Sequence, residues 1–282
     1  MKYFGFLARY VIAPFILMRT LIWWFRQQGQ TLPPSMSAGD EETVLALHST
    51  IALTYTTIWD NYLVASEVWG YDPKRVTGLR VGWVPIEEYS FFVLQPLLTG
   101  SWLQLMARFV PADDRPYNRD PRNRLIATGL LAVPWLISTV DLFTGPQKRK
   151  YLDLILSWAL PPIMLQVAFG GDILWRNRNM VATGIVPATL YLGWADSQAI
   201  GAGIWKINPK KTIGVDVIPH LPFEEFLFFL MTNVLLTFGV TLAQAQESED
   251  RLPEGIRQKY LVWKRDMKAR TDRLIQGTGD GQ

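Results

Sequence analysis

Two copies of one acidic motif contain the residues best suited to chemistry in this chain. The first copy spans residues 85–92 (Pro-Ile-Glu-Glu-Tyr-Ser-Phe-Phe) and the second spans residues 222–229 (Pro-Phe-Glu-Glu-Phe-Leu-Phe-Phe). Each begins where a polar loop turns into a long apolar segment, so a pair of carboxyl groups stands at the mouth of a membrane helix. Ionisable residues at that depth are costly and mark functional sites by default. The predicted catalytic residues are Glu87, Glu88, Glu224 and Glu225.

The start of a helix exerts two opposing influences on such acids. The preceding proline suits the first helical turn, where its missing N–H is no loss. The unpaired N–H groups and the helix dipole favour a carboxylate there, whereas apolar surroundings favour the neutral acid. A glutamic acid that keeps its proton at neutral pH is a usable general acid. Neighbouring residues project about 100° apart on a helix, so one Glu of each pair can face the other copy while its neighbour supports it.

Aromatic and acidic side chains accompany both copies. Trp59 and Asp60 lie in the apolar segment before the first copy, and Trp194 and Asp196 lie before the second. Aromatic faces stabilise cations without attacking them, so an acid beside an aromatic wall suits protonation of an alkene. Helix-end caps and core or lipid packing are the alternatives, and duplication of the whole motif favours function. The predicted substrate-binding residues are Trp59, Asp60, Tyr89, Phe92, Trp194, Asp196, Phe229 and Asn233.

Composition indicates a chain embedded largely in lipid. Hydrophobic residues make up 49% of it and charged residues only 19%, against about 25% charged in soluble domains. We therefore predict an all-α integral membrane protein with about seven transmembrane helices, each near the roughly 20 residues needed to cross a bilayer. The predicted spans are Tyr3–Phe25, Thr43–Ser66, Val84–Phe109, Leu125–Phe143, Tyr151–Leu174, Val181–Ile200 and Leu221–Ala243.

The two halves of the chain match one another. Residues 69–78 align with residues 205–214, with Trp, Pro, Lys and Gly at the same spacing. Spans one to three therefore recur as spans five to seven. Because three helices are an odd number, two copies joined directly would lie inverted in the membrane. The fourth span between them gives both copies the same orientation. This predicts two parallel three-helix repeats joined by a linking helix. The predicted units are residues 1–110 (first repeat), 111–149 (linker and fourth span), 150–244 (second repeat) and 245–282 (charged tail).

The sequence lacks the residues that several classes of chemistry require. The chain has no cysteine, which removes disulfides and thiol catalysis. Its two histidines, His48 and His220, lack metal-ligand spacing, and no dinucleotide or phosphate-binding glycine motif is present. We predict no metal, no cofactor and no nucleic-acid partner. The basic tail favours a cytoplasmic carboxyl terminus.

The chain resembles the membrane carotenoid (lycopene) cyclases in three features. These are the doubled Pro-x-Glu-Glu-x-x-Phe-Phe motif, the Trp-Asp and Trp-x-Asp pairs before its two copies, and Asn233 after the second copy. Such cyclases are heterodimeric in bacteria, fused into one chain in archaea, and present as the amino-terminal domain of fungal cyclase–phytoene synthase proteins. The resemblance covers residues 3–243 and is weakest in the first span. It implies that the chain corresponds to two fused small subunits in a prokaryotic cell membrane.

The resemblance also implies an activity, the redox-neutral β-cyclisation of lycopene. An acid protonates C2 of a linear end, the ring closes with positive charge at C5, and a carboxylate removes a proton from C6. Glu87 and Glu224 are then the first choice for this acid/base work, Glu88 and Glu225 their partners or alternates, and Asp60 and Asp196 supporting polar groups. The implied partners are a lipid-soluble carotenoid, membrane lipids and, as candidates, enzymes of the carotenoid pathway.

Two other functions fit the same residues. A cyclase acting on a C50 carotenoid or forming an ε ring would use the same scaffold with altered proton removal. A small transporter or lipid-binding protein would use the repeats for alternating access. Transporter repeats usually contain helices broken near the middle of the membrane, whereas the acids here stand at helix starts beside aromatic clusters, which favours the enzyme.

Overall fold

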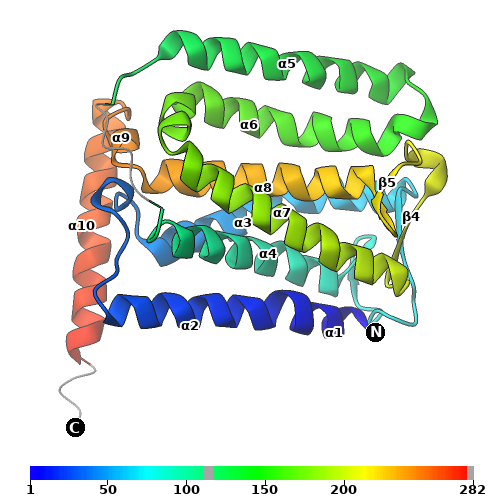
Figure 1. Cartoon of the computed structure of the whole chain (residues 1–282), viewed down its shortest axis with the longest axis horizontal. Coiled ribbons are helices and arrows are strands. Elements are labelled where there is room, and N and C mark those ends of the chain that lie inside the picture. The colour runs from blue at the N-terminus through cyan, green and yellow to red at the C-terminus, as the bar shows by residue number, and fades with distance from the viewer. Residues whose placement is uncertain (111–116, 278–282) are drawn as a thin grey trace.

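A computed structural model describes residues 1–110 and 117–277, with the side chains of Trp263 and residues 267–277 left out. Residues 111–116 of the predicted linker and 278–282 of the predicted tail lie outside the described residues. Within the described part, seven long helical segments form one bundle (Figure 1). They are α1 (Tyr3–Leu7) continuing through the π-helical turn η1 (Ala8–Ile12) into α2 (Ala13–Gln27), then α3 (Glu41–Ala65), α4 (Ile86–Met106), α5 (Pro121–Thr144), α6 (Lys150–Arg176), α7 (Arg178–Gly201) and α8 (Phe223–Gln244).

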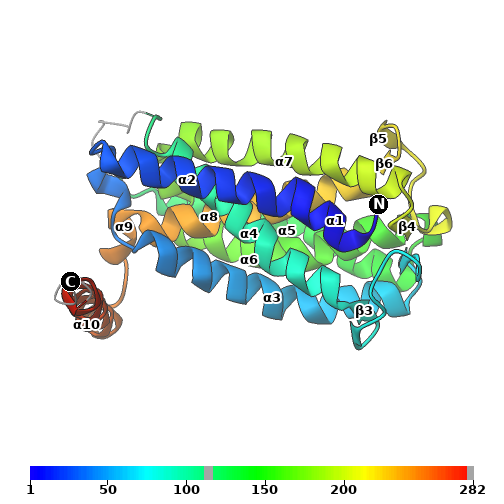
Figure 2. The same cartoon turned by 90° about the horizontal axis from the view of Figure 1, so that it is seen from below.

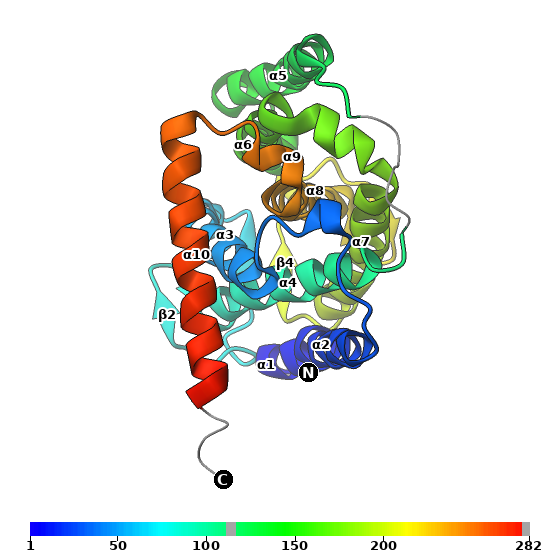
Figure 3. The same cartoon turned by 90° about the vertical axis from the view of Figure 1, so that its left-hand side faces the viewer.

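Helix α8 lies at the centre of the bundle, flanked by α3, α4, α6 and α7 (Figure 3). Helix α5 packs outside α6, and the α1–α2 segment packs outside α4 on the opposite face. Beyond a short turn, α9 (Gln246–Glu249), the tail helix α10 (Glu254–Gly277) runs across the end of the bundle. The chain is therefore nearly all helical, as the sequence predicts.

Four of these helices are long and apolar enough to cross a membrane on their own. Three others, α3, α4 and α7, bury polar residues such as Asp60, Gln95 and Asp196 inside the bundle, which lowers their hydropathy. The apolar helices confirm a membrane protein. The four spans are Tyr3–Gln27, Pro121–Thr144, Gln147–Arg176 and Phe223–Gln244.

Local sequence explains where the helices begin. The Asp40 carboxylate accepts a hydrogen bond from the Thr43 amide (2.9 Å) and caps α3, and Asp120 caps α5 in the same way. Pro85 and Pro222 stand one residue earlier than the expected first-turn position: each is the N-cap of its helix, with extended backbone. The paired glutamates consequently occupy the second and third positions of α4 and α8.

Three short antiparallel strand pairs, which the sequence analysis did not predict, gather at the end of the bundle where α4 and α8 begin (Figure 2). The central pair joins the two halves of the chain, with Gly70 opposite Lys206. The other two pairs end in the prolines that start α4 and α8 and so fix those helix starts. The pairs are β1 (Trp69–Tyr71) with β4 (Trp205–Ile207), β2 (Arg80–Val81) with β3 (Val84–Pro85), and β5 (Asp216–Ile218) with β6 (Leu221–Pro222).

Small residues allow the central helices to approach closely. A Cβ added at Gly184 of α7 would lie 2.7 Å from Leu103 Cδ1 and 3.0 Å from Thr237 Cγ2, on α4 and α8. Close helix contact through small residues is a common source of stability in membranes. Gly184 is thus a packing position, whereas a Cβ at Gly129 of α5 would meet nothing within 4 Å.

Replacing Gly184 with Leu should therefore destabilise the bundle, whereas Gly129→Leu should not. Overpacking a closely packed contact costs about 1–3 kcal/mol, and both substitutions change helix propensity equally. Thermal unfolding of the two variants in detergent, followed by circular dichroism, checks this. Equal unfolding temperatures for the two variants would contradict close packing at Gly184.

Candidate active site

Glu88, at the start of α4, accepts hydrogen bonds from two phenols. The hydroxyl of Tyr3 donates to its Oε2 atom at 2.6 Å, and the hydroxyl of Tyr71 donates to the same oxygen at 3.0 Å. Tyr3 begins the first helix and Tyr71 ends β1. Glu88 is only 6% exposed. Two long-range contacts therefore fix its position.

Glu225, at the start of α8, is held in a parallel way. Its Oε1 atom accepts from the Tyr151 hydroxyl at 2.8 Å and from the Trp69 indole N–H at 2.9 Å. Tyr151 lies in the first turn of α6, and Trp69 begins β1. Trp69 belongs to the first half of the chain and Glu225 to the second, so the first half supplies a donor to the acid of the second.

Glu88, Glu225 and Asp196 line one small cavity at the strand-covered end of the bundle. Its volume is about 20 Å³, roughly enough for one water molecule. In this closed form a substrate end enters only if the walls move apart. The remaining lining residues are Tyr3, Phe6, Trp69, Tyr71, Phe91, Leu192, Trp205, Phe228 and Phe229.

Two aspartates add further carboxyl groups to this centre. Asp196 Oδ1 accepts from the Trp205 indole N–H at 3.0 Å. Asp60 is fully buried, and neither of its oxygens has a hydrogen-bond partner among the described residues. Within the described part, no Lys or Arg forms an ion pair with Asp60, Asp196, Glu88 or Glu225. Carboxyl groups gathered without a cation cannot all be ionised at once, so the cluster is equipped to hold and exchange protons.

Glu87 and Glu224 have a different environment. Glu87 Oε1 accepts from the backbone N–H of Thr77 at 2.6 Å, and Glu224 Oε1 accepts from that of Ile213 at 2.7 Å. Each glutamate therefore anchors the loop that precedes its own helix. Neither lines the cavity, so the structure brings together the second glutamate of each pair rather than the first.

Among the other predicted residues, Phe229 lines the cavity and Trp59 stands behind its wall. The Trp59 ring stacks on Phe228 with 5.6 Å between centroids and on Trp158 with 4.5 Å. Its indole N–H donates to the Leu154 carbonyl at 3.1 Å. These near-parallel rings form an aromatic layer beside the acids.

Tyr89 and Phe92 lie on α4 away from the cavity lining, with ring centroids 5.7 Å apart. The Tyr89 hydroxyl donates to the Val81 carbonyl at 2.8 Å and so supports the loop. Deeper in the bundle, the Asn233 amide donates to the Thr189 hydroxyl at 3.2 Å. Trp194 is 47% exposed on the outer face of α7 and contacts Tyr10.

Four hydrogen-bond donors of the site were missed by the sequence analysis: Tyr3, Tyr71, Tyr151 and Trp205. Trp69 was noted only as one end of the repeat match, in which Trp205 is the other. A signal was available, because Tyr3 and Tyr151 each begin a predicted span and Trp69 and Trp205 occupy matching positions in the two halves. Among the described residues, no group of three or more His, Asp or Glu side chains is arranged to hold a metal ion.

A bundle of apolar helices around buried acids and aromatic rings suits a membrane enzyme that works by proton transfer. Comparison with known proteins identifies the family. The sequence profile of the family described as Lycopene cyclase matches residues 43–106 and 148–242, so the chain belongs to the lycopene cyclase family. This confirms the resemblance noted from the doubled motif.

Individual relatives agree. A lycopene beta-cyclase from Halobacterium salinarum is 40% identical over 193 residues, which cover 68% of this chain and 78% of that protein. Bifunctional lycopene cyclase/phytoene synthases from Sporisorium reilianum and Podospora anserina are 34% and 32% identical, covering 77% and 70% of this chain but 33% and 35% of their own length. No solved structure matches the chain.

Tyr71 should act as a permanent hydrogen-bond donor. Burial raises the pKa of its phenol well above the usual range, and the neighbouring carboxyl groups of Asp60 and Glu88 raise it further. A raised phenol pKa means that the neutral O–H persists through neutral and moderately alkaline pH, so Tyr71 does not become a phenolate there.

Tyr71→Phe should lower the turnover of the enzyme by roughly ten- to a hundredfold, because a hydrogen bond to a charged group contributes about 1.5–3 kcal/mol. Tyr89→Phe is the matched control, since its hydroxyl bonds to the loop and not to an acid. Turnover of lycopene by membranes containing equal amounts of each variant checks this. Equal losses in both variants would contradict a specific role for Tyr71.

Proposed function

We propose that this protein is a lycopene β-cyclase, which converts the linear ends of lycopene into β-ionone rings during carotenoid biosynthesis. The observation that carries the proposal is the meeting of Glu88 and Glu225 at one aromatic-walled cavity in a chain of the lycopene cyclase family. The relatives named as lycopene cyclases support this substrate.

The reaction needs one proton donor and one proton acceptor. A glutamic acid protonates C2 of a linear end, and the C1 cation is attacked by the C5–C6 double bond, which closes the ring and moves the charge to C5. A carboxylate then removes the C6 proton and leaves the C5–C6 double bond. One proton is added and one is lost, so substrate and product have equal mass.

We assign this acid/base work to Glu88 and Glu225 rather than to Glu87 and Glu224. Glu88 and Glu225 line the cavity, whereas the other two are occupied with loop amides. The rings of Phe228 and others in the lining present the faces that stabilise a carbocation without reacting with it. Asp60 and Asp196 support proton exchange within the cluster.

We further propose one composite site rather than one site in each half. Glu88 and Glu225 come from different halves and share a single cavity, and Trp69 of the first half donates to Glu225 of the second. The two ends of lycopene would then be cyclised in turn, with release or turning of the polyene between them.

The seven-span arrangement and its two parallel repeats remain part of this proposal. Their support is the strand pair β1–β4, in which Gly70 stands opposite its sequence counterpart Lys206, as a twofold axis through the pair requires. In addition, the Tyr3 hydroxyl donates to Glu88 as the Tyr151 hydroxyl donates to Glu225. We propose a location in a prokaryotic cell membrane with the basic tail on the cytoplasmic side, where carotenoid-pathway enzymes are candidate partners.

Expression in a bacterium that accumulates lycopene tests the proposed activity. We expect the pigment to change to γ- or β-carotene at unchanged mass, which chromatography with absorbance and mass detection resolves. Unchanged lycopene beside well-inserted protein would overturn the proposal and direct the search to C50 substrates and then to transport. An ε-ring product would place the difference in the final proton removal.

Glutamine substitutions test the assignment of the acids. Glu88→Gln and Glu225→Gln should each lower ring formation about 10²-fold or more, the usual contribution of a general acid or base. Glu87→Gln and Glu224→Gln retain a side-chain carbonyl that can accept from Thr77 or Ile213, so we expect much smaller losses. The assignment fails if the second pair of variants is inactive while the first pair retains activity at equal expression.

A further inference from the structure

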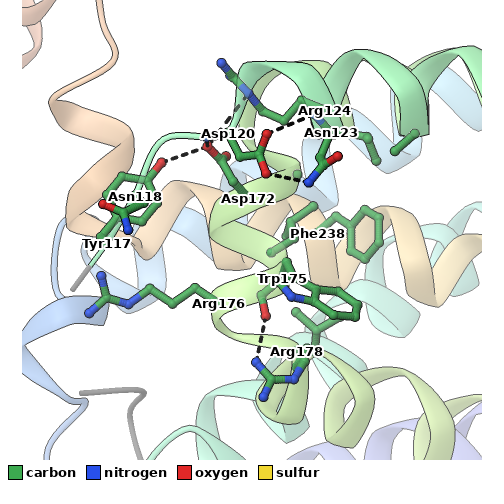
Figure 4. A pocket seen from close by; sticks show the side chains of 15 residues that line it. Tyr117, Asn118, Asp120, Asn123, Arg124, Asp172, Trp175, Arg176, Arg178 and Phe238 are labelled. Atoms are coloured by element: carbon green, nitrogen blue, oxygen red, sulfur yellow. Dashed lines mark hydrogen bonds and ion pairs between the residues drawn. The ribbon is translucent and has the colours of Figure 1, made fainter. Parts of the chain in front are cut away.

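The cavity beside the acids is small, and the largest cavity of the described chain does not lead to it. That larger cavity, of about 930 Å³, lies where α5 and α7 begin and α6 ends (Figure 4). Among the described residues, the two cavities have no lining residue in common. Phe238 of the larger one follows Glu225 by thirteen residues on α8, which is about 20 Å along a helix at 1.5 Å per residue. A substrate end therefore reaches the acids by another route.

A row of four aromatic rings leads from the wall of the acid cavity to the outer surface of the bundle. Phe228 lines the cavity, and Trp59 stacks on it with 5.6 Å between centroids and 7° between ring planes. Trp158 of α6 stacks on Trp59 at 4.5 Å and 19°, and Tyr55 of α3 stacks on Trp158 at 5.5 Å and 20°. Tyr55 is 42% exposed. This aromatic row therefore connects the acids with the surface along the seam between α3 and α6.

The outer end of the aromatic row lies on a stripe of exposed apolar and aromatic side chains along α3. These side chains recur every three or four residues and are Leu47, Ile51, Tyr55, Ile58 and Tyr62. In the proposed seven-span arrangement the stripe faces the hydrocarbon of the bilayer. Tyr55 stands ten residues before the end of α3 at Ala65, which is about 15 Å along the helix. A hydrocarbon core is about 30 Å thick, so a polyene dissolved in it has access to Tyr55.

A proline in α6 determines how this seam is held together. Pro162 lies inside α6 and has no N–H, so the carbonyl of Trp158, four residues earlier, has no i+4 donor in its own helix. The Tyr55 hydroxyl donates to that carbonyl at 2.8 Å. The indole N–H of Trp158 has no hydrogen-bond partner among the described residues, so this side chain contributes its ring face to the seam. At the outer end of the aromatic row, α3 is therefore joined to α6 through a side-chain hydroxyl, which can be displaced without breaking a helix.

The second half of the chain has a corresponding contact with a different ring geometry. Pro14 follows Tyr10 by four residues, and the Tyr191 hydroxyl of α7 donates to the Tyr10 carbonyl at 2.9 Å. Here, however, the exposed ring of Trp194 meets the Tyr10 ring edge-on, with 74° between their planes. Flat conjugated systems stack with parallel, offset planes. The parallel rings of the first half therefore suit a conjugated chain better than the crossed rings of the second.

We propose that the seam between α3 and α6 is a binding site for the conjugated chain of a linear polyene substrate, with Tyr55 and Trp158 in contact with that chain. The proposal rests on the proposed cyclase function, because it takes the aromatic row as the continuation of the acid cavity. A polyene end displaces the Tyr55 hydroxyl from its carbonyl, slides along the faces of Trp158 and Trp59, and arrives at Glu88 and Glu225. The part of the polyene that does not react stays in the seam and in the surrounding lipid.

Trp158→Leu tests this site through kinetics, with Tyr10→Leu as the matched control in the other half. Both substitutions leave the main-chain carbonyl that accepts from a tyrosine, so the hydrogen bonds between the helices can remain. We expect Trp158→Leu to raise the KM for lycopene about fivefold, the scale of one lost stacking contact. Its kcat should change little because the acids are untouched, and Tyr10→Leu should leave both values nearly unchanged. Equal changes in the two variants, or a loss confined to kcat, would overturn the proposal.

A second measurement reports binding without turnover. Tyr55 or, as the control, Tyr191 is replaced by a phenylalanine that carries a photoreactive diazirine, and membranes containing the protein and lycopene are irradiated. We expect mass spectrometry to find a lycopene adduct at position 55 and none at position 191. An adduct at position 55 without ring formation would support the binding site and contradict the cyclase assignment. The absence of an adduct at position 55, or equal adducts at both positions, would overturn the binding site even where rings are formed.

Discussion

Buried carboxyl groups held by neutral donors are the interaction on which this structure depends. Glu88 and Glu225 each accept two hydrogen bonds, from phenols or an indole, and neither has an ion-pair partner among the described residues. A cation would fix these acids as carboxylates, and water would screen them. Neutral donors instead position the acids while leaving the proton transferable, which is what the proposed acid/base chemistry on a hydrocarbon would require. The bundle and the strands at its end bring these donors together.

The pairing of the glutamates follows from helix geometry. Because adjacent residues project about 100° apart, the two members of a pair cannot serve the same place. Glu87 and Glu224 turn toward the loop and bind Thr77 and Ile213, which anchors the loop that carries each helix start. Their neighbours then face the cavity in a fixed direction. The motif thus combines one structural and one central carboxyl group in each half.

Sequence reasoning predicted the long helices, the acidic motif and the family, since periodicity and local spacing encode them. It did not predict the strand pairs or the donors Tyr3 and Tyr151, because those contacts join residues far apart in the chain. Trp194 illustrates the limit of spacing. Trp59 directly precedes Asp60, whereas Ala195 is inserted between Trp194 and Asp196. This insertion places Trp194 on the exposed face of α7.

The two halves are alike in sequence but not in their hydrogen bonds, and this asymmetry bears on how one site distinguishes acid from base. Trp205 donates to Asp196 in its own half, whereas its counterpart Trp69 donates across the interface to Glu225. Asp60 is consequently left fully buried without a described partner. Two identical acids in identical surroundings would share a proton evenly and neither would be poised to give or to take it. In the proposed composite site, the unequal donors around Asp60, Asp196, Glu88 and Glu225 would make the acids inequivalent and so give proton transfer a direction.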